Sequence, residues 1–266
     1  MKIGFIGMGN MAQAIAAGFV SSKKIAASDL FAYAPNQEKL KANAQKIGFV
    51  PLASNKEVAQ KSDAVFVCCK PYQIEGVLSE VGAALDGKAL VSVAAGWTFD
   101  SYAKFLDTNK TRVLCVMPNT PARIGQGVIL LEEKNSLNDE EAKQIKDLLG
   151  SLGLLETIPA SLMGIGGALS GCGPAFMDMI IEAYADAAVK YGMGRAQAYR
   201  LASQMMLGSA ALQLATGEHP GALKDAVCSP GGTTIRGVAA LEKAGLRTAC
   251  IQSIDTIMEF KNSKSN

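Results

Sequence analysis

Short apolar runs alternate with longer segments of helical hydrophobic spacing through the first half of the chain. The run at residues 2–6 predicts a strand, and Ile15, Ala16 and Phe19 share one face of the helix expected after it. Ser54 and Glu57 have the spacing of a capping box that opens another helix. The remaining predicted strands are 30–33, 64–68, 88–93, 112–116 and 128–131, and the remaining helices are 36–47, 74–85 and 139–149. Alternation of this kind is typical of a parallel α/β domain.

The pattern changes after Ile158-Pro159. Long alanine-rich helices are predicted at about 175–191 and 195–215, and a final one near 247–261. The first two carry apolar residues on more than one face, and one chain offers too few layers to bury such helices. We therefore expect two domains, 1–160 and 161–266, the second packing against a second copy of itself in a two-fold dimer.

A glycine-rich run lies directly between the first strand and the first helix. It reads Gly7-Met8-Gly9-Asn10-Met11-Ala12, which is the pattern G-x-G-x-x-A. In a dinucleotide site the first glycine permits the tight turn, the second lets the pyrophosphate approach the backbone, and the small third residue packs helix on strand. An ordinary glycine-rich turn is the alternative. The position at a strand–helix junction predicts an α/β Rossmann-type dinucleotide-binding domain.

The end of the second strand bears on the choice of cofactor. NAD-specific sites usually carry Asp or Glu there, to bind the ribose 2′-hydroxyl. This strand ends in Tyr33-Ala34-Pro35-Asn36, and the nearest acid, Asp29, precedes the strand. No arginine is present to clamp a 2′-phosphate, although Lys39 on the next helix can approach it. We expect NADPH to be preferred and NADH to be tolerated.

Composition narrows the classes of function. Hydrophobic residues make up 49% of the chain, charged residues 19%, and the net charge is +2. This balance gives no reason to expect nucleic acid or a membrane surface as a partner. No signal-peptide pattern and no apolar run of about 18 residues is found, so a cytoplasmic protein is expected. Six cysteines without a C-x-x-C pair, and a single histidine, His219, predict reduced thiols and no metal site.

The stretch 220–242 is the most informative part of the second half. A helix is expected to end near Val227-Cys228-Ser229, Pro230-Gly231-Gly232 to form a turn, and Thr233-Thr234 to open a second, hydroxyl-capped helix. The free N–H groups at such a helix start favour an anion, and the threonine hydroxyls lie beside them. A plain turn with an N-cap is the alternative for Gly-Gly-Thr alone.

The whole stretch resembles the signature of the pyrroline-5-carboxylate reductase family at nearly every constrained position. The matching residues are Leu223, Val227, Cys228, Ser229, Gly231, Gly232, Thr234, Gly237, Val238, Leu241 and Glu242. Three loops after predicted strands are similar to the family's A-V-K-P, A-A-G and M-P-N-T-P: Cys68-Cys69-Lys70-Pro71, Ala94-Ala95-Gly96 and Met117-Pro118-Asn119-Thr120-Pro121. The run from Ser170 to Phe176 resembles the family's S-G-S-G-P-A-Y. The resemblance extends from Ile3 to about Phe260.

The resemblance implies a fold and an activity. The fold is a Rossmann-type domain followed by an all-α dimerisation domain, similar to the C-terminal domain of 6-phosphogluconate dehydrogenase. Such helical domains interlock as dimers, which often assemble into decamers. The activity is NAD(P)H-dependent hydride transfer to the C=N bond of 1-pyrroline-5-carboxylate, which gives L-proline in the last step of proline biosynthesis.

The resemblance also implies site residues. Thr234 would be catalytic, its hydroxyl bonding the imine nitrogen, and the substrate would contact Gly231, Gly232, Thr233, Thr234 and Ser170. The implied cofactor contacts are Ile6, Gly7, Met8, Gly9, Asn10, Met11, Ala12, Ala34, Asn55, Cys68, Cys69, Lys70, Pro71, Ala94, Ala95, Gly96 and Asn119. For Lys70, a solvated surface cation is an equal alternative.

This chain departs from the family pattern at several places, the first being Cys68 and Cys69, which replace smaller or branched apolar residues. Cys172 replaces a serine, and Phe176 lacks the usual phenol hydroxyl. Gly217 stands where many relatives carry an acid, with Glu218 one position later. For His219, in a loop before a helix, a structural or surface use is favoured over general acid catalysis. The Ser170–Phe176 run has the alternative of a turn that enters a helix at proline.

Two other functions stay open from the sequence. One is a different imine or hydroxyacid reductase on the same scaffold. Related β-hydroxyacid dehydrogenases keep a catalytic lysine with asparagine four residues later, whereas here Lys190 lies at a helix end and residue 194 is glycine. The other is a non-catalytic NADPH-sensing protein. The intact turn and helix start at Gly231-Gly232-Thr233-Thr234 argue against this second function.

Overall fold

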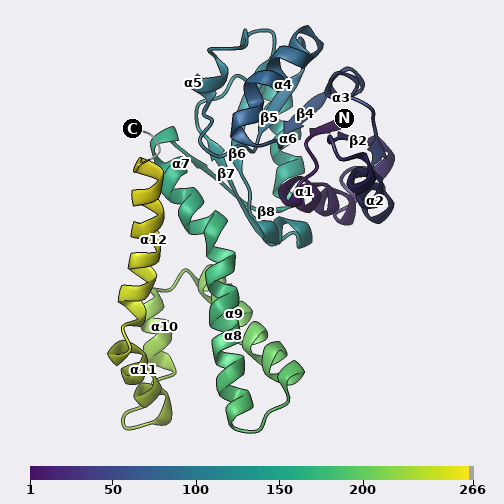
Figure 1. Ribbon diagram of the computed structural model, residues 1–266. Helices are drawn as coiled ribbons and strands as arrows, with labels where there is room; N and C mark the ends of the chain where they lie inside the picture. Colours follow the sequence, from purple (N-terminus) through teal and green to yellow (C-terminus); the bar gives the residue numbers. More distant parts are fainter. Residues whose placement is uncertain (264–266) are drawn as a thin grey trace. The chain divides into compact units, whose positions relative to one another are not determined.

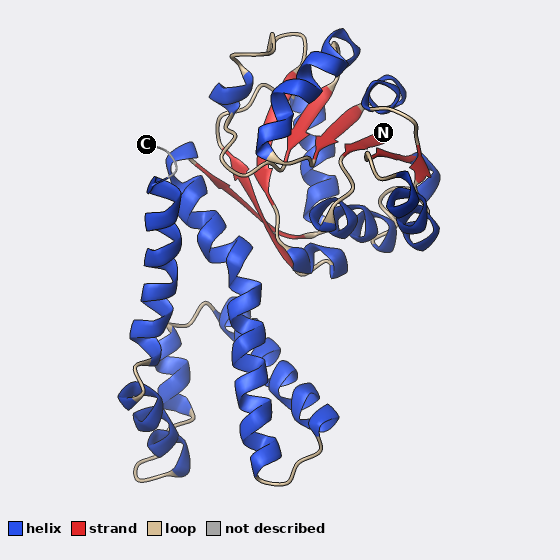
Figure 2. Cartoon of the chain, in the orientation of Figure 1, coloured by secondary structure: helices blue, strands red, loops and turns tan. Residues whose placement is uncertain are grey.

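The computed structural model describes residues 1–263, which form two compact units (Figure 1). The first is Met1–Cys172 and the second begins at Gly173. The change in composition at Ile158-Pro159 comes earlier, because the first turns of the long helix that follows still pack on the sheet of the first unit. Figure 2 shows the strands of the first unit in red and the second unit as helices and loops.

The first unit is built on an eight-stranded sheet of order β3-β2-β1-β4-β5-β6-β7-β8. The strands are β1 (Ile3–Ile6), β2 (Leu30–Tyr33), β3 (Val50–Pro51), β4 (Ala64–Val67), β5 (Ala89–Ser92), β6 (Arg112–Met117), β7 (Gly127–Glu132) and β8 (Gly153–Ile158). All residues of β1 and β4 are buried, as expected of central strands covered on both faces.

The predicted parallel α/β domain is confirmed, with one antiparallel strand pairing that the sequence pattern did not indicate. Strands β3 to β6 pair in parallel, but β7 runs antiparallel to β6, and β8 runs parallel to β7. The connection from Met117 to Gly127 holds only a short 3₁₀ turn, Thr120–Ile124. A parallel crossover needs a dozen or more residues, so this short link reverses the chain direction.

Helices cover both faces of the sheet (Figure 1). Residues of α1 (Asn10–Ser21), α2 (Gln37–Ile47) and α6 (Asp139–Gly150) join one apolar core. Residues of α3 (Asn55–Lys61), α4 (Ile74–Val81) and α5 (Phe99–Tyr102) join the other. The predicted helix 74–85 is thus α4 followed by a 3₁₀ turn at Gly82–Leu85, since Gly82 has a φ of 29° that ends the α-helix.

Capping explains where several of these helices begin. Asn36 and Asn138 accept the N–H groups of Lys39 and Glu141 at the starts of α2 and α6. Ser54 accepts the Glu57 N–H at 3.1 Å, but the Glu57 carboxylate accepts the Ala53 N–H rather than that of Ser54. The predicted capping box is therefore half correct: its reciprocal bond is displaced by one residue.

The end of the first unit continues into the second as one long helix, 160–190. It consists of α7 (Ala160–Gly166), a π-helical turn at Gly167–Gly171, and α8 (Cys172–Lys190). The alternative of a turn in the Ser170–Phe176 run is wrong, because the chain stays helical through it. The second unit continues with α9 (Arg195–Thr216), α10 (Pro220–Ala226), α11 (Thr233–Lys243) and α12 (Leu246–Ser263).

Apolar side chains of the second unit are mostly exposed. Among its described residues, only Ala185, Ala198 and Ala202 belong to the buried hydrophobic set. Its large exposed apolar residues include Met177, Met179, Leu201, Met205, Leu207, Leu212, Leu214, Ile251 and Phe260. Helix 160–190 is long and apolar enough to cross a membrane by length and composition alone, with 11% of its most apolar window buried. An exposed apolar surface of this extent marks a region of association.

Candidate cofactor and substrate sites

The loops after β1, β2 and β4 lie together at the carboxyl ends of these neighbouring strands. Strand β1 lies between β2 and β4, so the chain order reverses direction beside it. The Gly7 N–H donates to the Tyr33 carbonyl at 2.8 Å, and the Cys68 N–H donates to the Ile6 carbonyl at 2.8 Å. Ligands of open parallel sheets bind at the carboxyl ends of strands, at such a reversal.

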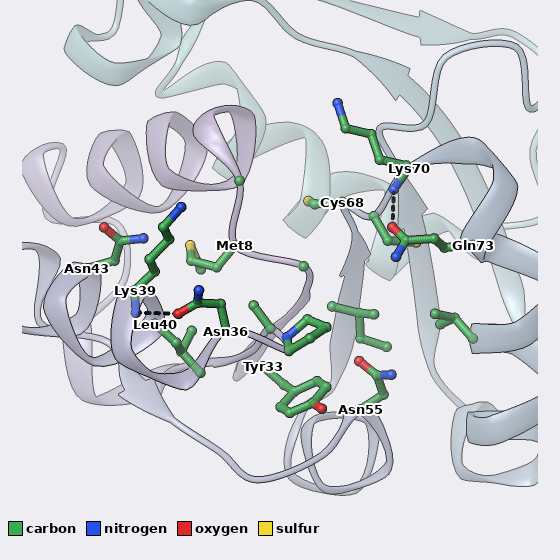
Figure 3. Close-up of a pocket in the computed structure, with 17 residues that line it drawn as sticks. Met8, Tyr33, Asn36, Lys39, Leu40, Asn43, Asn55, Cys68, Lys70 and Gln73 are labelled. Atoms are coloured by element: carbon green, nitrogen blue, oxygen red, sulfur yellow. Dashed lines mark hydrogen bonds between the residues drawn. The ribbon is translucent and has the colours of Figure 1, made fainter.

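A cavity of about 430 Å³ opens at this place (Figure 3). It brings together nine of the residues predicted to contact a cofactor, from three separate loops and the start of α3. These are Ile6, Gly7, Met8, Gly9, Ala34, Asn55, Cys68, Cys69 and Lys70.

The other predicted cofactor residues lie outside this cavity. Asn10, Met11 and Ala12 form the first turn of α1, and Pro71 begins the 3₁₀ turn before α4. Ala94, Ala95 and Gly96 follow β5, and Asn119 follows β6, on the far side of β4 from β1. The loops after β5 and β6 therefore continue the row of strand carboxyl ends along which a long dinucleotide would lie.

Gly7 and Gly9 serve different physical needs. Gly7 has a φ of 91°, and a Cβ there would lie 2.9 Å from the backbone of Cys68 and Cys69. Gly9 has an ordinary extended conformation, and a Cβ there would meet no atom within 4 Å. Gly9 is also the N-cap of α1, with no side-chain cap and no acid in the first turn. Space, free N–H groups and the helix dipole together fit a pyrophosphate.

Sequence reasoning missed several lining residues on α2. Leu40, Asn43 and the N-cap residue Asn36 line the cavity beside Lys39, which the sequence had already indicated as able to approach a 2′-phosphate. Figure 3 shows the Lys39 side chain extended with Asn43 on one side and Met8 on the other. Their spacing of three and four residues places them on one helical face. This helical spacing is the sequence signal that could have indicated them as a group. The other lining residues not predicted are Tyr33, Pro35, Gln73 and Val77.

The polar groups of the cavity are only partly paired within the protein. Asn55 is buried, and its Nδ2 donates to Glu80 Oε2 at 2.6 Å. The Lys70 N–H donates to Gln73 Oε1 at 3.0 Å, while the Lys70 residue is exposed. Burial raises the pKa of the Cys68 and Cys69 thiols, so both stay protonated at neutral pH. All six cysteines are free, and the described residues contain no group that could hold a metal.

Asn119 binds the π-helical turn. Its Nδ2 donates to the Ser170 carbonyl at 2.9 Å, and its Oδ1 accepts the Val128 N–H at 2.9 Å. Pro174 has no N–H, so it cannot donate to the Ser170 carbonyl four residues earlier. Asn119 therefore supplies the donor that the helix lacks. The Ser170 hydroxyl donates to the Gly166 carbonyl at 2.9 Å and keeps its acceptor capacity for a ligand.

The corner before α11 is in the second unit. Gly231 has a φ of 70°, and the Gly232 N–H donates to the Ser229 carbonyl at 3.0 Å. Helix α11 begins at Thr233, as predicted, but its N-cap is Gly232, and no side chain caps it. The expectation of a hydroxyl cap is thus wrong. The hydroxyls of Thr233 and Thr234 stay available, and the first-turn N–H groups keep no side-chain acceptor.

His219 has a structural task. It is the N-cap of α10, and its Nδ1 accepts the Gly221 N–H at 3.0 Å. The prediction of a structural use over general acid catalysis agrees with this geometry.

Comparisons with known proteins cover both parts of the chain. A family model described as pyrroline-5-carboxylate reductase dimerisation matches residues 160–263, and one described as NADP oxidoreductase, coenzyme F420-dependent, matches residues 2–96. The curated pyrroline-5-carboxylate reductase of Treponema pallidum (strain Nichols) is 41% identical over 257 residues, which are 96% of this chain and 97% of the relative. That of Escherichia coli (strain K12) is 41% identical over 259 residues, 97% and 96% of the two chains.

A solved structure agrees with these matches. The crystal structure of Plasmodium falciparum pyrroline carboxylate reductase with NADP bound superposes with a TM-score of 0.89 at 28% identity, covering 100% of this chain and 98% of that chain. The likeness therefore includes both the Rossmann-type sheet and the helices that follow it.

Proposed function

The chain belongs to the pyrroline-5-carboxylate reductase family, and from this we propose that it transfers hydride from NAD(P)H to the C=N bond of 1-pyrroline-5-carboxylate, which gives L-proline. The observation that carries the proposal is the match to curated reductases over 96% of the chain and nearly all of theirs. The cavity at the carboxyl ends of β1, β2 and β4 supports the cofactor part of it.

The dinucleotide fits the residues of the first unit. Its pyrophosphate would lie on the free N–H groups at Gly9 and the start of α1, and its adenosine half against Ala34, Asn55 and α2. The loops of Cys68–Pro71 and Ala94–Gly96 would line the half that carries the nicotinamide. The cofactor supplies the hydride; the protein supplies its position.

The substrate would bind at the start of α11. Its carboxylate would accept hydrogen bonds from the free backbone N–H groups near Gly232-Thr233, that of Thr233 among them, where the helix dipole contributes about half a positive charge. The Thr234 hydroxyl would hydrogen-bond the imine nitrogen, and Ser170 would offer a further polar contact. Hydride adds to the imine carbon and a proton to the nitrogen. A cyclic imine can be protonated in water beforehand, so no strong acid is needed in the site.

The proposed activity has a direct test that separates the rival functions. Purified protein is mixed with NADPH and pyrroline-5-carboxylate, and the nicotinamide absorbance is followed. Loss of absorbance with this imine but not with 2-hydroxyacid precursors supports the proposal. Turnover of keto acids alone would indicate a hydroxyacid enzyme, and cofactor binding without any turnover would indicate a sensor.

NADPH is the proposed cofactor over NADH, with Lys39 as the group that binds the 2′-phosphate. Lys39→Met is expected to raise the KM for NADPH about 10-fold, or 1.4 kcal/mol, because a charge-assisted hydrogen bond is lost. The KM for NADH should stay unchanged, since NADH lacks that phosphate. Lys41→Met, on the same helix but outside the cavity, is the matched control. Equal losses for both cofactors would contradict this assignment.

The helical part is a dimerisation domain by its family match, so the protein forms an oligomer through it. We propose a two-fold dimer that covers the exposed apolar residues of α8 and α9, and a decamer of five such dimers. Light scattering at micromolar concentration should give a mass of ten chains, or of two where the dimers separate. A mass of one chain would contradict both. Burial of helix 160–190 in this way also supports a cytoplasmic enzyme over a membrane-bound one.

A further inference from the structure

The segment between β5 and α5 is held at both ends by buried hydrogen bonds. At its start, the Ala94 N–H donates to Ser92 Oγ at 3.2 Å, and this oxygen shares a 2.7 Å hydrogen bond with the Tyr102 hydroxyl. At its end, the Phe99 N–H donates to Glu132 Oε2 at 2.9 Å. The loop Ala94–Gly96 lies between these two ties. Its geometry therefore depends on side chains outside it.

Glu132 is costly to keep at its position. It is the last residue of β7 and only 1% exposed, and its Oε1 has no hydrogen-bond partner among the described residues. A buried carboxyl group with one oxygen unpaired opposes folding; an apolar side chain of similar size would avoid that penalty but would leave the buried Phe99 N–H without this acceptor. Burial, and next to it the charge of Glu132, raises the pKa of the neighbouring Cys115 thiol. Glu132 thus accepts the Phe99 N–H while its second oxygen stays unpaired among the described residues.

A second contact of α5, with a residue just after β7, lies at the surface and contrasts with the buried bond to Glu132. Lys134 Nζ lies 2.6 Å from Asp100 Oδ1 and 5.4 Å from the centre of the Phe99 ring. The Lys134 and Asp100 side chains are 59% and 66% exposed, and such surface pairs contribute about 0–1 kcal/mol. Of these two polar contacts, the buried bond from Phe99 to Glu132 is thus the one that holds the first residue of α5 against β7.

We propose that Glu132 is a positioning residue for the cofactor. By fixing the Phe99 end of the segment, it holds the backbone of Ala94–Gly96 toward the nicotinamide half of the dinucleotide. Gly96 has a φ of 81°, so the loop turns sharply and its direction is sensitive to where its far end is anchored. This inference rests on the proposed cofactor contact of Ala94–Gly96.

The test compares Glu132→Met with Glu132→Gln. Trp97, the single tryptophan of the chain, borders the loop, so its fluorescence reports NADPH binding without turnover. Glu132→Met removes the acceptor at similar volume and is expected to raise the Kd for NADPH about 10-fold, with the KM for pyrroline-5-carboxylate within about twofold of the wild type. Glu132→Gln keeps an oxygen acceptor for the Phe99 N–H and should restore wild-type binding. Glu133→Gln, at the exposed neighbouring acid, is the matched control.

The outcomes separate positioning from a merely structural role. A structural role would lower the Tm of Glu132→Met and leave the Kd for NADPH unchanged at 25 °C, which overturns the proposal. If Glu132→Met does not fold, Glu132→Asp takes its place. It keeps the carboxyl group but withdraws it by one methylene, and an unchanged Kd would again overturn the proposal.

The same titration separates this inference from the proposed activity. Wild-type protein that binds NADPH but does not reduce pyrroline-5-carboxylate would overturn the activity, and the variants would still decide the role of Glu132. Wild-type protein that binds no NADPH would overturn both.

Discussion

Replacing Thr234 by alanine is expected to lower kcat by about 10- to 1000-fold, or about 1.4–4 kcal/mol in the activation barrier. The methyl group that replaces the hydroxyl cannot bond the imine nitrogen, so the C=N bond loses its orientation toward the hydride donor. Thr234 is the second residue of α11 and its hydroxyl does not cap that helix, so the change should leave folding intact. Steady-state kinetics with NADPH and pyrroline-5-carboxylate, together with the Tm, measure both expectations.

Two further variants define what the Thr234 hydroxyl does. Thr234→Ser keeps the hydroxyl and should retain most of the turnover. Thr233→Ala keeps the backbone N–H proposed to bind the carboxylate, so its loss should be smaller than that of Thr234→Ala. Full turnover in Thr234→Ala would remove this residue from the mechanism, and an equal loss in Thr233→Ala would point to the helix start as a whole.

Local signals in the sequence were sufficient for the central strands and for the cofactor turn. Strand β2 and the start of α9 fall at their predicted residues, because hydrophobic periodicity and nearby breakers are properties of a few adjacent positions. The Gly7–Ala12 turn likewise lies between a strand and a helix. The family resemblance is confirmed by relatives 41% identical over nearly the whole chain.

Contacts between distant segments account for what the sequence did not reveal. Strand β8 was not predicted, since it is an edge strand with exposed Glu156. Its Gly153 is required because its φ is 141° and because the backbone of Gly127 lies against it. The run around Pro174 suggested a turn, since glycine and proline usually mark turns. It stays helical because Asn119, 51 residues away from Ser170, donates the hydrogen bond that proline cannot. Buried Glu132 gives no local signal at all.

The second large effect is expected at the cofactor turn, where two glycines should respond differently to the same substitution. Gly9→Ala should raise the Kd for NADPH about 100-fold, or about 2.7 kcal/mol, because the added methyl occupies the space where the pyrophosphate approaches the backbone. Its free energy of unfolding should stay within about 1 kcal/mol of the wild type, since the backbone is extended and the new Cβ meets no protein atom within 4 Å.

Gly7→Ala should instead destabilise the fold itself, by about 2 kcal/mol or more, because the left-handed backbone and the Cys68-Cys69 main chain at 2.9 Å leave no room for a Cβ. Urea unfolding and the fluorescence of Trp97 with added NADPH measure stability and binding on the same samples. The two variants thus distinguish Gly7, which is needed for folding, from Gly9, which is needed for cofactor binding. A Gly9→Ala protein that binds NADPH as tightly as the wild type would mean that the pyrophosphate lies elsewhere, however well the turn matches the pattern.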